Sequence, residues 1–200
     1  EAIEIMAKSK HFKTDDIVND STQATALHLI ALHSTNRPKD AMVTMKLLIE
    51  KYKCNLINTP DAFGHSPIFA SIKSGDLNIM KYMVEAGADI DFQRNEGFNN
   101  TPLHFAMEDC NEDIIDFLLK NGANISLYNN ANRLPIHEAA VSGCISGLRL
   151  LLKHQSDQIN IATRNYIPVE EFNSIDAKIS LFNATPLHHA ALYGNYEAVD

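Results

Sequence analysis

The sequence predicts an all-α solenoid, in which short helix–turn–helix units with extended loops stack side by side. Two observations predict this fold: a tetrapeptide recurs five times, and apolar residues follow each copy at helical spacing. The composition agrees, because 45% hydrophobic and 21% charged residues in a chain of 200 suit a folded protein with a substantial core. One such unit cannot bury its apolar face alone, so neighbouring units must stack.

The tetrapeptide marks the start of the first helix in each unit. Its copies are Thr25-Ala-Leu-His28, Ser66-Pro-Ile-Phe69, Thr101-Pro-Leu-His104, Leu134-Pro-Ile-His137 and Thr185-Pro-Leu-His188. Their second residues are 41, 35, 33 and 51 positions apart, which indicates a period of 33 to 35 lengthened twice by insertions. A Thr or Ser hydroxyl can accept from free amides of the first turn, and Pro at the first helical position loses no hydrogen bond.

The remainder of each unit predicts a second helix and a loop. A break at Gly75, Cys110, Gly143 or Gly194 precedes a second apolar stretch, such as Ile114-Ile115 with Leu118-Leu119. The unit then closes with Gly87-Ala-Asp-Ile-Asp91 or Gly122-Ala-Asn-Ile-Ser126, where Gly suits the left-handed position after a helix. The Met residues at 42, 45, 80 and 83 fall at helical spacing and are predicted to lie in the core.

This recurrence resembles the ankyrin-repeat family over about residues 21 to 200. The departures are Ala26 for Pro, Phe69 for His, Leu134 for Thr and Cys110 for Gly, and none of them interrupts the apolar pattern. We expect residues 1–20 to be the end of a preceding repeat with a linker, and residues 1–8 to be its outer helix. The predicted repeats are 21–64 with an inserted loop, 65–98, 99–131, 132–183 with a long insertion, and a truncated repeat at 184–200.

The histidines could indicate a catalytic or metal-binding site, but their positions in the repeat indicate a structural role. His28, His104, His137 and His188 share one repeat position, and the resemblance implies that they tie neighbouring turns together by hydrogen bonds. A row of one His per repeat cannot surround a zinc ion. His33, His65 and His154 are expected at the surface. We therefore predict no catalytic residues, no metal site and no cofactor.

Cysteine content and charge exclude other classes of protein. The chain has three Cys residues, an odd number, without a CxxC spacing, so Cys54, Cys110 and Cys144 are expected to be small buried thiols rather than disulfide partners. A net charge of -8 argues against binding to nucleic acid. No apolar run is long enough to span a membrane, so membrane contact would require other parts of a parent protein.

The resemblance implies a partner-binding surface made from the loop tips and the exposed face of each first helix. By register it comprises Phe63, His65, Lys73, Ser74, Phe98, Asn100, Glu108, Asp109, Asn130, Arg133, Val141, Ser142, Leu192 and Tyr193. Phe63 and Phe98 are the best anchor candidates, because exposed aromatic residues dominate binding hot spots; the alternative is that each packs against the next loop. Insertions at 34–40 and 161–183 are either further binding elements or tolerated surface loops.

The sequence is compatible with several classes of parent protein. The chain begins with Glu and stops within a repeat, so we expect it to be a piece of a longer protein. Its irregular period, insertions and four Asn-x-Ser/Thr sequons at Asn19, Asn99, Asn124 and Asn183 resemble the ankyrin array of spider latrotoxins. That resemblance implies a secreted neurotoxin that binds neuronal receptors, oligomerises and forms cation pores. The alternatives are a cytoplasmic scaffold, a bacterial effector that recruits one protein, or an enzyme whose catalytic domain lies elsewhere.

Overall fold

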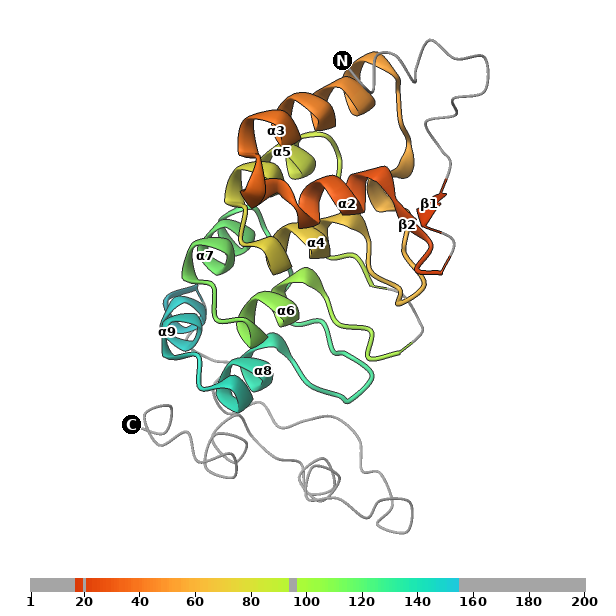
Figure 1. Ribbon diagram of the computed structural model, residues 1–200. Helices are drawn as coiled ribbons and strands as arrows, with labels where there is room; N and C mark the ends of the chain where they lie inside the picture. The colour runs from red at the N-terminus through yellow and green to blue at the C-terminus, as the bar shows by residue number, and fades with distance from the viewer. Residues whose placement is uncertain (1–16, 20, 94–96, 155–200) are drawn as a thin grey trace. The chain divides into compact units, whose positions relative to one another are not determined.

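The computed structural model describes residues 17–19, 21–93 and 97–154 (Figure 1). The chain divides into two compact units, Glu1–Phe92 and Gln93–Asp200, and each is considered by itself. Within its described residues each unit contains two antiparallel helix pairs joined by an extended loop (Figure 1). The prediction of an all-α repeat fold is confirmed.

In its described residues the first unit holds a short hairpin and four α-helices. Its elements are β1 (Ile17–Asn19), β2 (Ala24–Thr25), α2 (Ala26–Leu32), α3 (Pro38–Lys46), α4 (Pro67–Ser74) and α5 (Leu77–Glu85). The inserted segment forms a single 3-10 turn, Ser34–Asn36, and Pro38 then opens α3. A π-helical turn, Leu47–Lys51, extends α3, and a 3-10 turn, Leu56–Asn58, precedes the next loop.

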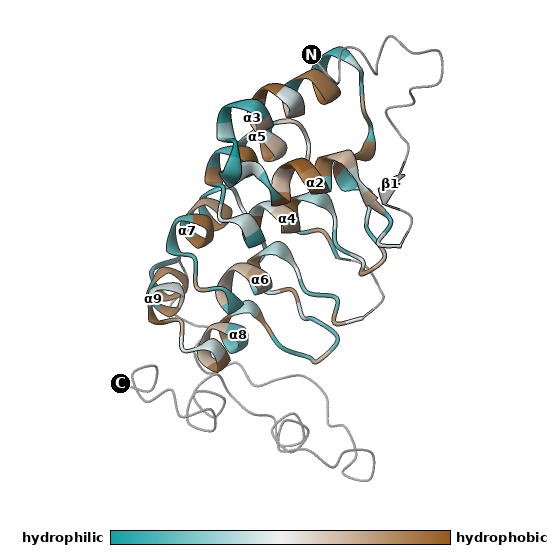
Figure 2. Cartoon of the chain, in the orientation of Figure 1, coloured by the Kyte–Doolittle hydropathy of each residue, from teal (hydrophilic) through white to brown (hydrophobic). Residues whose placement is uncertain are grey.

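The second unit repeats the same plan. Its described helices are α6 (Pro102–Glu108), α7 (Glu112–Lys120), α8 (Pro135–Ser142) and α9 (Ile145–His154). First helices pack on first helices, α6 on α8, and second helices on second helices, α7 on α9. The latter two carry both hydrophilic and hydrophobic residues along their length (Figure 2), as helices with one buried face must.

Helix starts and connecting turns follow the local sequence. Proline begins α4, α6 and α8, while Asp76 and Asn111 cap α5 and α7 through their side chains, which accept from backbone amides of the first turn. The turn between paired helices is left-handed at Gly75 and Gly143, with φ near 72° and 71°. Cys110 occupies the equivalent turn with φ 51°, so a residue other than glycine adopts this backbone there.

The core lies between the two layers of helices in each unit. Leu27, Ile68 and Ile72 are buried in the first unit, and Leu103, Ile114 and Leu118 in the second. Of the four Met residues predicted to be core, Met45, Met80 and Met83 are fully buried, whereas Met42 is half-buried. The methionine prediction is confirmed for three positions.

Two of the repeat histidines, His28 and His104, connect successive repeats, as expected. The Nδ1 atom of His28 accepts from the Thr25 amide at 3.1 Å, and its Nε2–H donates to the His65 carbonyl at 2.9 Å. His104 repeats this geometry with the Thr101 amide at 3.2 Å and the Arg133 carbonyl at 3.0 Å. Each ring therefore needs one bare nitrogen and one N–H, which is the neutral form. His188 lies outside the described residues.

Burial holds these rings in the neutral form. Removal from water lowers the pKa of His104 to about 4, although its hydrogen bond to the Arg133 carbonyl opposes the shift. Burial also lowers the pKa of His28. An unfolded chain would protonate these histidines near pH 6.5, so folding should weaken as the pH falls from that value towards 4.

We expect acid to destabilise the second unit through His104. Between pH 7 and pH 5 the imidazole of His104 becomes protonated in the unfolded chain but stays neutral in the folded one. The contribution of His104 to the free energy of unfolding should therefore fall by about 2 kcal/mol as the pH is lowered from 7 to 5. Urea titrations of the chain across that range measure it. His104→Gln keeps a donor for the Arg133 carbonyl but cannot titrate, so its stability should vary less with pH. An unchanged pH dependence in this variant would contradict the assignment.

Candidate partner-binding surface

The predicted surface divides between the two units. In the first unit Phe63 and Lys73 are exposed, while His65 and Ser74 are half-buried. In the second unit the exposed members are Phe98, Glu108, Asp109, Asn130 and Ser142, and the half-buried members are Asn100, Arg133 and Val141. Leu192 and Tyr193, like the 161–183 insertion and the outer helix expected at 1–8, lie outside the described residues.

A hydrogen-bonded loop presents Phe63. The Asp61 carboxylate accepts from the amides of Phe63 and His65, both at 2.9 Å, and the Asp61 amide donates to the His65 carbonyl at 2.8 Å. The Ala62 amide donates to the carbonyl of Thr22 in the preceding loop. Phe63 projects from this fixed loop with 69% of its surface exposed, so its ring is available to a partner with little ordering of the backbone.

His65 is more enclosed than the sequence suggested. Its ring lies 5.2 Å from that of Phe69 and 6.4 Å from that of Phe63, measured between centroids. Burial lowers the pKa of His65, and the nearby Asp61 carboxylate partly opposes this. The expectation of a surface His65 is therefore met only in part, because the loop folds its ring onto Phe69, the aromatic residue that replaces the repeat histidine, and leaves it half-buried. His33 and His154 are exposed, as expected.

A second fixed loop carries Phe98. The Asn130 amide donates to the Phe98 carbonyl at 2.9 Å, and the Asn130 side chain donates to the Gly97 carbonyl at 2.6 Å. These bonds hold the backbone of the Phe98 turn against the next loop, yet the Phe98 side chain is 76% exposed. The alternative, that the ring itself packs against the neighbouring loop, is not what the structure shows.

Asn129 organises the loop that follows, from the register position that Asp61 holds in the first unit. Its side-chain oxygen accepts from the amides of Ala131 and Arg133, both at 3.0 Å. Its side-chain nitrogen donates to Asn100 at 2.8 Å and to Glu138 at 3.0 Å. One buried amide thus fixes the loop and joins it to the start of two helices.

Glu138 lies beside this amide and is largely enclosed. Burial raises the pKa of its carboxyl, while Arg133, at 3.7 Å, and the hydrogen bond from Asn129 oppose the shift. Sequence reasoning missed both Glu138 and Asn129. A signal was available for Glu138, because it lies three and four positions before Val141 and Ser142 and so shares their helix face.

Other members of the predicted surface are engaged inside the protein. The Ser142 hydroxyl donates to the Met107 carbonyl at 2.8 Å, and the Ser74 hydroxyl donates to the Ser71 carbonyl at 3.1 Å. Lys73 on α4, Glu108 on α6 and Asp109 directly after α6 remain exposed. The exposed charged groups and the two Phe rings are therefore the side chains best placed to meet a partner.

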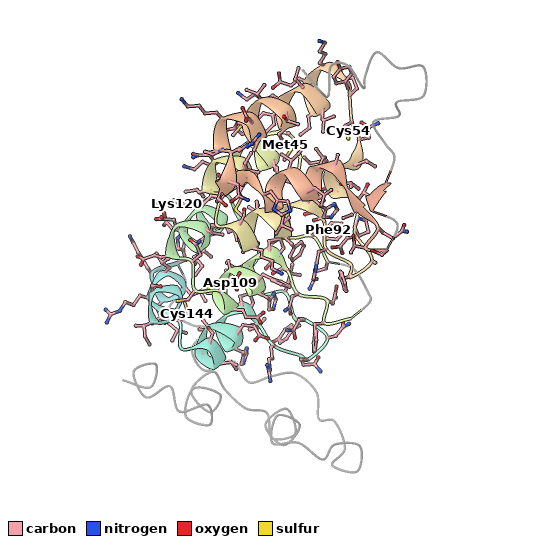
Figure 3. The ribbon with its side chains drawn as sticks, in the orientation of Figure 1. Met45, Cys54, Phe92, Asp109, Lys120 and Cys144 are labelled. Carbon is pink, nitrogen blue, oxygen red and sulfur yellow. A yellow bond between two sulfur atoms is a disulfide. The ribbon has the colours of Figure 1, made fainter. Side chains whose placement is uncertain are left out.

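The expectation of three unpaired thiols is wrong for two of them. Cys110 and Cys144 form a disulfide with a Cα–Cα distance of 5.2 Å, whereas Cys54 is a buried cysteine outside any disulfide (Figure 3). The two partners are 34 positions apart, one repeat period, so stacking brings their inter-helix turns side by side. The prediction was wrong because this pairing follows the repeat period of the chain and not a local spacing of cysteines.

Two absences hold for the described part of the chain. Residues 17–19, 21–93 and 97–154 contain no group of three His, Cys, Asp or Glu side chains placed to hold a metal ion. Among the same residues no helix is both long and apolar enough to cross a membrane.

Glu138 explains why this loop position is Asn129 in the second unit but Asp61 in the first. The residue at the register of Glu138 in the first unit is Ala70, so Asp61 meets no second carboxylate there. We expect Asn129→Asp to cost about 1–2 kcal/mol of stability, because it loses two donors and faces Glu138. Adding Glu138→Ala should recover at least half of that loss, as measured by urea unfolding. Additive effects of the two substitutions would contradict this explanation.

Comparison with known proteins agrees with this architecture. The family model for ankyrin repeats in three copies matches residues 1–94 and 86–165, and the model for ankyrin repeats in many copies matches residues 136–200. Among similar proteins, the phosphocholine transferase AnkX of Legionella pneumophila is 31% identical over 123 residues, which are 61% of this chain and 12% of that protein.

Two further relatives show how widely these repeats occur. The probable 26S proteasome regulatory subunit p28 of Saccharomyces cerevisiae is 28% identical over 109 residues, 54% of this chain and 48% of that protein. The transient receptor potential cation channel subfamily A member 1 of Drosophila melanogaster is 26% identical over 183 residues, 88% of this chain and 14% of that protein. The chain spans at most about half the length of these three relatives.

The family models cover the chain from end to end, and the helix pairs, left-handed turns and repeat histidines agree with them. Ankyrin repeats are non-catalytic modules for protein–protein interaction. This chain belongs to the ankyrin-repeat family.

Proposed function

We propose that these repeats recruit a partner protein to a larger parent protein, and that Phe63 supplies the main apolar contact of the first unit and Phe98 that of the second. The observation that carries the proposal is their exposure, 69% and 76%, on loops that are already fixed by hydrogen bonds. A bare Phe ring in water gains from burial, and a fixed loop loses little entropy on binding. Lys73, Glu108 and Asp109 would then set specificity by charge.

A selection from random peptides tests this proposal, because it does not require the natural partner. Peptides from a phage-displayed random library are selected on the wild-type chain, and their affinities are measured by fluorescence anisotropy. Phe63→Ala should weaken peptides that bind the first unit at least about tenfold, and Phe98→Ala should do the same for peptides that bind the second unit. Val43→Ala is the matched control, because Val43 is 59% exposed on α3 and belongs to neither loop; it should bind like wild type.

Stability separates this surface from a structural role. Since neither Phe ring is buried, both variants should keep the wild-type urea midpoint within error. Unchanged affinity in both Phe variants would overturn the anchor assignment, and so would a large fall in stability in either one.

The parent protein and its location are a further proposal. We infer that the chain works in an oxidising compartment, which fits a secreted protein of the latrotoxin-like kind better than a cytoplasmic one. The support is the Cys110–Cys144 disulfide, because such bonds persist outside the cytosol and are rare within it. None of the three relatives named above is a toxin by name, so receptor binding, oligomerisation and pore formation rest on the sequence resemblance alone.

Differential alkylation of the protein from its natural source tests the compartment. Free thiols are blocked with N-ethylmaleimide in a denaturant at lysis, so that a reduced Cys144 also reacts despite its burial, and the protein is then reduced and labelled with iodoacetamide. A protein from an oxidising compartment should carry iodoacetamide label at Cys110 and Cys144. N-ethylmaleimide at both positions would favour the cytoplasmic scaffold or effector instead.

A further inference from the structure

We propose that the Cys110–Cys144 disulfide is a thiol–disulfide exchange site for small thiols such as glutathione, which enter at the Cys110 sulfur. Exchange at this site would control whether the pair α6–α7 is cross-linked to the pair α8–α9. The proposal does not depend on which partner protein the repeats recruit.

Only one of the two sulfur atoms belongs to an exposed residue. Cys110 lies in the turn between α6 and α7 and is exposed, whereas Cys144, directly before α9, is fully buried. The third cysteine, Cys54, is 5% exposed in the first unit. Because Cys110 is an exposed residue and Cys144 is buried, an incoming thiolate should attack the Cys110 sulfur in preference to the Cys144 sulfur.

The sulfur of Cys144 is well placed to be the leaving group when a thiolate attacks Cys110. Its residue stands at the start of α9, because the Leu148 amide donates to the Cys144 carbonyl at 3.0 Å. The positive end of that ten-residue helix favours negative charge on a departing sulfur. In addition, the Ser146 hydroxyl lies 3.6 Å from the sulfurs of both Cys110 and Cys144, within reach to donate to either one.

The exchange balances with two thiols. A glutathione thiolate attacks the Cys110 sulfur, a mixed disulfide forms, the Cys110–Cys144 bond breaks, and Cys144 leaves as a thiolate that takes up a proton. A second glutathione thiolate then attacks the glutathione sulfur of the mixed disulfide and releases the Cys110 thiolate with oxidised glutathione. The protein gains two electrons, and two thiols are oxidised to one disulfide. In the reverse direction Cys144 resolves the mixed disulfide.

Opening the bond should loosen the last described helix pair. The disulfide joins turns that are 34 positions apart, and its loss removes that restraint from α8 and α9. The remaining ties across this end of the repeats include the Ser142–Met107 hydrogen bond and the close packing at Gly147, where even a Cβ atom would come within 2.6 Å of the Met107 sulfur. Asp109 and Ser142 adjoin these turns and belong to the predicted binding surface. The distance between them should therefore change when the disulfide opens.

Matched variants test the direction of attack. Cys144→Ser leaves the exposed thiol, and Cys110→Ser leaves the buried one. Treated with oxidised glutathione, Cys144→Ser should form an adduct at residue 110 at least about ten times faster than Cys110→Ser forms one at residue 144, as followed by peptide mass spectrometry. Equal rates, or the reverse order, would overturn the proposal.

Hydrogen exchange tests the consequence in the wild-type chain. After treatment with reduced glutathione, amides of α9 should exchange roughly 10²-fold faster than in the oxidised chain, while those of α4 stay unchanged. Cys110→Gly provides the control, because glycine occupies the same turn at positions 75 and 143 and suits the left-handed backbone. This variant should exchange like the reduced wild type with or without glutathione. Identical α9 exchange in oxidised and reduced wild type would refute the cross-link's role.

Discussion

The hydrogen bond from a repeat histidine to the next loop is the constraint on which each unit depends. A helix pair of this size cannot bury its own apolar face, and packing alone would let neighbouring pairs slide. His28 and His104 prevent this, because each ring accepts from the amide at its own helix start and donates to a carbonyl at the start of the following repeat. His28 holds the Phe63 loop directly through the His65 carbonyl, whereas His104 holds the Arg133 loop, whose Asn130 in turn bonds the Phe98 turn.

The second described repeat shows what happens without that histidine. Phe69 occupies the position and contributes ring contacts with His65 and Phe92 instead of hydrogen bonds from imidazole nitrogens. The Ser66 hydroxyl, which stands where Thr25 and Thr101 meet their histidines, is buried without a hydrogen-bond partner. Aromatic packing thus replaces a polar network at this repeat, and half-buried His65 is part of the replacement.

Features that recur in every repeat could be predicted from the sequence, whereas contacts that occur in a single repeat could not. The tetrapeptides, the glycine turns and the exposed Phe rings follow from periodicity, since equivalent positions have equivalent surroundings. The position of the His65 ring depends on one substitution, Phe69, and Asn129 acts through a partner nine residues away. The disulfide depends on a contact between turns one period apart, which becomes visible only when the cysteines are placed on the repeat register.

That disulfide also restricts how the chain can change in length. Elsewhere the array tolerates additions: the first repeat carries a 3-10 turn between its helices, and two tetrapeptide spacings exceed the basic period by several residues. Between residues 110 and 144 the two sulfurs meet because their separation equals one turn-to-turn step. An insertion in a loop tip there could bulge outward harmlessly, but one within a helix would rotate a cysteine away from its partner. The disulfide can therefore form only while the helices between residues 110 and 144 keep their present lengths.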